Sequence, residues 1–85
     1  MGQGEKRLSD MRRNPRDGWQ IEDVRVVCSE FGIELRPPSS GSHFKVTHPK
    51  RQEILTIPAK RLVKPIYIKQ FVAFVDQLRK TDNDD

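Results

Sequence analysis

The stretch SSGSHFKVTHP sets Gly41, Ser42 and His43 directly before the alternating apolar residues Phe44 and Val46. An imidazole is mostly neutral at pH 7 and accepts a proton from a hydroxyl group. A glycine lets a phosphate or a ribose approach the backbone, because it carries no side chain. A serine hydroxyl adds a hydrogen-bond donor. This combination suits chemistry on an RNA backbone, in which the substrate's own 2′-hydroxyl group is the nucleophile.

Strand alternation decides where the imidazole points. Successive residues of a strand face opposite sides of a sheet, so burial of Phe44 and Val46 directs His43 and Lys45 to the uncovered face. The same alternation over Ile33–Arg36 directs Arg36 to the uncovered face of the sheet. A register shift of one residue would expose both apolar side chains, which is costly. The sequence therefore predicts a basic, shallow surface that carries a histidine.

The predicted site residues are polar or cationic groups gathered on this surface. We expect His43 to be the catalytic residue, and Gly41, Ser42, Lys45 and Arg36 to bind RNA. Lys45 is also the candidate for stabilising the negative charge of the transition state. The alternative interpretation is that His43 is an ordinary exposed residue and that Lys45 is only a solvated cation.

The second histidine, His48, is not expected to join the site. It lies five residues beyond His43, so it faces the opposite side of the strand and sits about 16 Å away along it. We expect it to end the strand before Pro49. The two histidines and the single cysteine, Cys28, are too few and too widely spaced for a zinc site. We therefore expect no metal and no cofactor, and a buried Cys28.

Residue periodicity predicts an α+β fold. Apolar residues recur at helical spacing over residues 19–32, and a second helix is expected to begin at Pro65. Between the helices, residues 33–36, 43–48 and 54–58 alternate as strands. The order α-β-β-β-α gives a three-stranded antiparallel sheet, because short connections join consecutive strands. Both helices have one apolar face, so we expect them to pack on the same face of the sheet.

Local signals set the ends of these helices and the limits of the domain. Gln20 and Asp23 are expected to cap the start of the first helix and Gly32 to end it. The domain is predicted to span residues 18–80. Residues 1–17 are expected to form a flexible N-terminal arm and residues 81–85 an acidic, disordered tail.

The charge balance favours a polyanionic partner. The chain of 85 residues carries a net charge of +4, and three of its acids lie among the last four residues. Without those three acids the remainder carries +7, which points to RNA or DNA before a membrane surface. The sequence has no apolar run of the roughly 20 residues that a membrane helix needs, and no segment typical of a signal peptide. We therefore expect a cytoplasmic protein with no membrane partner.

Several of these motifs together resemble the HicA family of bacterial type II toxins. The similarity lies in GSHFKVTHP, in LTIPAKRLVKPIYIKQFVAFVD and in the opening GWQIEDVRVV…FG, and it covers about residues 18–79. It implies a double-stranded-RNA-binding-domain-like fold and the activity of a metal-independent mRNA endoribonuclease. It assigns the functional histidine to His43. It also implies a HicB-type antitoxin as the partner that covers the active surface.

Two other functions remain open on the sequence. The first is an RNA-binding module without catalysis, which would bind RNA by shape and by its 2′-hydroxyl groups. The second is a protein-interaction module whose basic sheet face meets an acidic partner. Cleavage-site preference and oligomeric state do not follow from the sequence.

Overall fold

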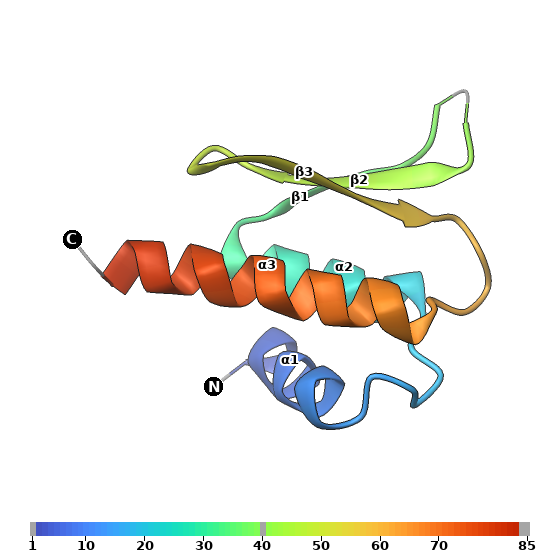
Figure 1. Ribbon diagram of the computed structural model, residues 1–85, viewed down its shortest axis with the longest axis horizontal. Coiled ribbons are helices and arrows are strands. Elements are labelled where there is room, and N and C mark those ends of the chain that lie inside the picture. The colour runs from blue at the N-terminus through green and yellow to red at the C-terminus, as the bar shows by residue number, and fades with distance from the viewer. Residues whose placement is uncertain (1, 40, 84–85) are drawn as a thin grey trace.

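A three-stranded sheet lies over a pair of helices, with a third helix beneath the pair, in the computed structural model, which describes residues 2–39 and 41–83 (Figure 1). The chain forms α1 (Gln3–Arg13), α2 (Ile21–Phe31), β1 (Glu34–Arg36), β2 (His43–His48), β3 (Arg51–Pro58) and α3 (Pro65–Asn83). The prediction of an α+β fold with a three-stranded antiparallel sheet is confirmed.

The strands form a meander with the order β1-β2-β3. Arg36 of β1 lies opposite Lys45 of β2, and His43 of β2 lies opposite Pro58 of β3. At the other end of the hairpin His48 pairs with Arg51, so β3 begins three residues before the predicted Ile54. The extra residues are strand because the β2–β3 ladder continues to this short turn, with one irregularity between Val46 and His48.

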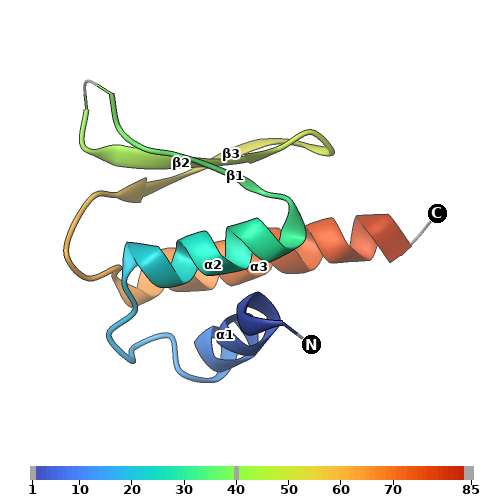
Figure 2. The same cartoon turned by 180° about the vertical axis from the view of Figure 1, so that it is seen from behind.

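Helices α2 and α3 lie side by side on one face of the sheet (Figures 1 and 2). Val46 and Ile57 of the sheet and Phe71 and Val75 of α3 have no exposed surface, and Val27 of α2 joins them in the same core. The sheet and the pair of helices each bury one apolar face against the other, because an apolar face must be covered by a second packed layer. The strand alternation therefore directs every second residue of β2 away from the helices.

The ends of the helices follow the predicted signals. The backbone N–H of Gln20 donates to the carboxylate Oδ2 of Asp23 at 3.0 Å, which fixes the first turn of α2. Gly32 takes the left-handed conformation, with φ of 67°, and so ends the same helix. Helix α3 begins at Pro65, where the missing N–H removes no helical hydrogen bond.

The predicted element order was wrong at the N-terminus. Residues 3–13 form helix α1 instead of part of a flexible arm, so the order is α-α-β-β-β-α. Leu8 is 1% exposed and Met11 is fully buried, and both belong to the main core. The helix lies beneath α2 and α3, on the side away from the sheet (Figure 2). Helix α1 forms because Leu8 and Met11 cover apolar surface of α2 and α3 that the sheet does not cover.

Ion pairs also join α1 to its neighbours. Arg7 pairs with Asp23 of α2 at 3.1 Å, and Arg12 pairs with Asp76 of α3. The predicted disordered tail was wrong over residues 81–83, because α3 continues through Asn83. Asp84 and Asp85 lie outside the described residues. No helix in the described part of the chain is long and apolar enough to cross a membrane.

Candidate functional site

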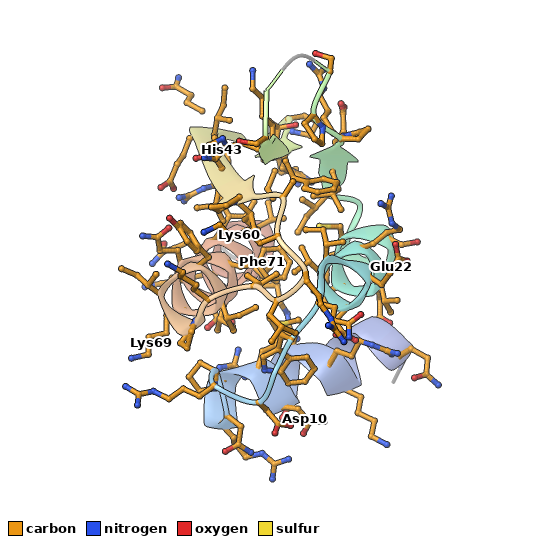
Figure 3. All side chains as sticks on the ribbon, turned by 90° about the vertical axis from the view of Figure 1, so that its right-hand side faces the viewer. Asp10, Glu22, His43, Lys60, Lys69 and Phe71 are labelled. Carbon is orange, nitrogen blue, oxygen red and sulfur yellow. The ribbon has the colours of Figure 1, made fainter. Side chains whose placement is uncertain are left out.

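His43 lies on the uncovered face of the sheet, at the first residue of β2 (Figure 3). Val46 is completely buried and Phe44 is half-buried, whereas His43 and Lys45 are exposed. Arg36 is also exposed, and it lies directly across the β1–β2 ladder from Lys45. The predicted strand parity is confirmed, and it puts the imidazole and both cations on one surface.

A surface hollow brings all five predicted site residues together. Its volume is about 380 Å³, and it opens between the start of β2 and the loop that follows β1. We call it the His43 hollow. Its lining consists of Arg36, Pro37, Pro38, Ser39, Gly41, Ser42, His43 and Lys45. Two prolines stiffen one wall, while the opposite wall is strand and therefore also rigid.

Arg36 is held in place by Glu34, two residues earlier on the same side of β1. The guanidinium Nε donates to the carboxylate Oε2 of Glu34 at 2.5 Å. This hydrogen bond, together with the negative charge of the carboxylate, raises the pKa of Arg36. Both side chains are well exposed, so an incoming phosphate can compete with the carboxylate for the same donor.

Lys45 offers a cation without an internal partner. It is exposed, and it forms no ion pair with any acid in the described part of the chain. Its position opposite Thr56 on β3 and Arg36 on β1 puts it in the middle of the sheet face. An ammonium group here can reach an anion that lies over either neighbouring strand.

Gly41 and Ser42 shape the rim of the hollow. A Cβ atom added to Gly41 would meet nothing within 4 Å, and its φ is not positive. The protein itself therefore does not require a glycine at this position, whereas a bound molecule could. The carbonyl oxygen of Ser42 accepts the N–H of Ala59 at 2.6 Å, which ties this rim to the chain that leaves β3.

His48 stands at the opposite end of β2, as expected. Its Nδ1 accepts the backbone N–H of Lys50 at 3.0 Å within the β2–β3 turn. It does not line the His43 hollow. Among the described residues no group of three or more His, Cys, Asp or Glu side chains could hold a metal ion.

Sequence reasoning missed two features of the site. It did not identify Glu34 as the partner of Arg36, although a spacing of two residues in a strand puts both side chains on the same face. It also missed the wall formed by Pro37, Pro38 and Ser39. This wall depends on the course of an irregular loop, for which periodicity holds no signal.

The arrangement combines one proton acceptor with two cations and an open backbone segment. Such a surface can bind a phosphodiester and remove a proton from a hydroxyl group beside it. No protein-family model, curated protein or solved structure matches the chain.

Proposed function

We propose that the protein is a HicA-type toxin, a metal-independent endoribonuclease that cleaves mRNA at the His43 hollow. The observation that carries the proposal is the hollow itself. It brings His43 together with Lys45, Arg36, Gly41 and Ser42, four groups expected to bind RNA. An mRNA substrate would place its action in the cytoplasm.

The motifs that resemble the HicA family fall at the ends of structural elements. This supports an architecture shared with the HicA family, because each motif lies where a strand or a helix begins or ends. Gly-Ser-His leads into β2, His-Pro joins the end of β2 to the β2–β3 turn, Thr-x-Pro ends β3, and Lys-Pro leads into α3. Elements α2 to α3 have the α-β-β-β-α order of a double-stranded-RNA-binding-domain-like fold, with α1 added in front.

In the proposed reaction His43 acts as the general base. Its imidazole takes the proton of the ribose 2′-hydroxyl, and the 2′-oxygen attacks the adjacent phosphorus. The bond from phosphorus to the 5′-oxygen breaks, which leaves a 2′,3′-cyclic phosphate and a 5′-hydroxyl end. Lys45 and Arg36 face the non-bridging oxygens, where negative charge grows in the transition state. Solvent gives the proton to the leaving oxygen, since His48 lies at the other end of the strand.

A HicB-type antitoxin is the proposed partner. The sheet face is rigid, exposed and cationic, so an acidic protein surface laid over it would close the His43 hollow. Inhibition would then need no change in the toxin fold. The antitoxin and the RNA would compete for the same groups.

The test uses the protein freed of any antitoxin and an RNA with a mapped cleavage position. We expect cleavage in the presence of EDTA, with a cyclic phosphate at the new 3′ end. A single deoxyribose on the 5′ side of the cut should abolish cleavage, because it removes the nucleophile. Equal cleavage of the deoxyribose substrate would contradict the mechanism.

The second candidate is an RNA-binding module without catalysis. It is favoured because, among the described residues that line the His43 hollow, His43 carries an imidazole and no other residue carries a second one that could act as a proton donor. In that case the same RNA binds in a salt-dependent manner and stays intact.

A further inference from the structure

The positive charge of the chain is concentrated in one segment. Residues 35–75 contain eight lysines and arginines and one acid, Glu53, which gives this segment a net charge of +7. Because the whole chain carries +4, all other residues together carry −3. The segment includes most of the sheet, the β3–α3 connection and the first half of α3.

Most cations outside this segment are neutralised by ion pairs. The three helices hold their arginines against nearby acids. The pairs are Arg7–Asp23, Arg12–Asp76, Arg13–Asp10, Arg25–Glu22 and Arg79–Glu5. Among the described residues, most of the cations that pair with no acid therefore lie on the sheet side and at the start of α3, and Lys6, Arg16 and Lys80 are the exceptions outside this segment.

Four exposed cations continue from the His43 hollow toward α3. We call Lys60, Arg61, Lys64 and Lys69 the cation row. Each is exposed, and none pairs with an acid in the part of the chain that the structure describes. In Figure 3 His43, Lys60 and Lys69 follow one another down one side of the molecule. The labelled acids Glu22 and Asp10 lie away from this line.

The cation row begins directly beside the hollow. Pro58 lies opposite His43 in the β2–β3 ladder, and the next residue, Ala59, donates its N–H to Ser42 on the rim. A polyanion that occupies the hollow can therefore continue onto Lys60, with Pro58 and Ala59 lying between the two.

Two exposed apolar side chains, Leu62 and Ile66, lie among these cations and raise the question of a protein partner. A protein segment with an apolar anchor would need a pocket to receive it. The hollow lined by Leu62, Val63 and Tyr67 is about 40 Å³, against about 380 Å³ for the His43 hollow. The surface therefore fits a phosphate backbone better than an anchored peptide.

The path also favours a single strand over a duplex. The cation row leaves the sheet face, passes along the β3–α3 connection and reaches the side of α3, so a ligand must bend around the molecule. The longest dimension of the protein is 37 Å. Double-helical DNA stays straight over roughly 500 Å, and a single strand bends freely.

We propose that the cation row binds the phosphates that flank the cleavage position, so that the substrate is single-stranded RNA several nucleotides long. This inference rests on the proposed function, because it extends the RNA path from the His43 hollow. The hollow holds the reacting phosphate, and the cation row supplies affinity through ionic contacts that carry no sequence information.

The test compares a variant of the cation row, Lys60→Gln/Arg61→Gln/Lys64→Gln, called the track variant, with a matched control, Lys6→Gln/Arg16→Gln/Lys80→Gln. Both remove three exposed charges, and the control residues lie on α1, in the α1–α2 connection and near the end of α3. Binding is measured with a fully 2′-O-methylated single-stranded RNA of about a dozen nucleotides, which cannot be cleaved. Cleavage of a dinucleotide is measured alongside.

We expect the track variant to bind this RNA about 10- to 100-fold more weakly at low salt. The slope of log K against log[salt] should become less steep by about 2, because three phosphate contacts are lost. The control should bind like the wild type. Dinucleotide cleavage should be the same in all three proteins.

Equal RNA binding by the track variant and the control would overturn the inference, even if the wild type cleaves RNA. An equal loss of affinity for duplex RNA would overturn the single-stranded substrate class. If the wild type cleaves nothing and only the track variant loses RNA affinity, the proposed function fails while the RNA path stands.

Discussion

Glu30 of α2 caps the first turn of α1, because its carboxylate Oε1 accepts the backbone N–H of Gly4 at 2.9 Å. The other oxygen of the carboxylate accepts the N–H of Glu5 at 3.2 Å. The two helices approach closely here: a Cβ on Gly4 would lie 2.7 Å from the Cβ of Glu30 and 2.9 Å from the carbonyl oxygen of Val26. A glycine at this position is therefore a packing requirement of the α1–α2 contact.

Gly4→Ala is expected to destabilise the protein by about 1–3 kcal/mol, since backbone atoms of α2 cannot yield to the new methyl group. Gly41→Ala is the matched control, because a Cβ there meets nothing within 4 Å. Urea denaturation measures both free energies of unfolding. Gly41→Ala should leave stability unchanged but weaken RNA cleavage, and equal stability of the two variants would contradict the close contact.

Leu8→Ala is expected to lower the free energy of unfolding by about 2–5 kcal/mol, because the Leu8 side chain is 1% exposed and its removal leaves a cavity between α1 and the other helices. Ser9→Ala, at the next and exposed position, serves as the control. The denaturation midpoint reports the difference. A flexible N-terminal arm would instead give the same midpoint for both variants.

Sequence periodicity predicted the sheet face on which His43 lies but did not predict helix α1, and the reason differs for the two. Alternation of Phe44 and Val46 depends only on neighbouring residues, so it set the direction of His43 correctly. Leu8 and Met11 are two apolar residues in a polar stretch, and their burial depends on surface provided by distant parts of the chain. The wide apolar face of α3, which buries Phe71, Phe74 and further residues, was the available sign that a second layer was needed.

Cys28 is expected to resist alkylation in the folded protein. Burial raises the pKa of its thiol from 9.0 to about 12, against a smaller lowering effect from Arg25. Iodoacetamide reacts with the thiolate, so at pH 8.5 labelling should occur only after unfolding. Rapid labelling of the native protein, followed by mass spectrometry, would contradict this burial.

The raised pKa of Cys28 also predicts how the free energy of unfolding changes with pH. The thiol keeps its proton in the folded state up to about pH 12, whereas the unfolded chain releases it from about pH 9. The contribution of the Cys28 thiol to the free energy of unfolding is therefore complete below pH 9. It is lost as the pH rises toward 12, by about 1.4 kcal/mol per pH unit. Cys28→Ala should show a flatter decline in stability over that range.

Glu34→Gln is expected to strengthen RNA binding about two- to fivefold at low salt. The substitution removes a negative charge beside the His43 hollow and frees Arg36 for phosphate. Glu53→Gln is the control, since that acid pairs with Arg51 and does not line the hollow. Titration with non-cleavable RNA measures both affinities, and a weaker complex for Glu34→Gln would contradict a role for Arg36 in phosphate binding.

The most direct measurement is the single-turnover rate of RNA cleavage by His43→Gln beside His48→Gln. The two variants lose the same group at opposite ends of β2, and thermal unfolding checks that both remain folded. We predict a loss of about 10²- to 10⁴-fold for His43→Gln and a rate close to wild type for His48→Gln. Equal rates for the two variants would show that the sheet-face histidine does not carry the reaction.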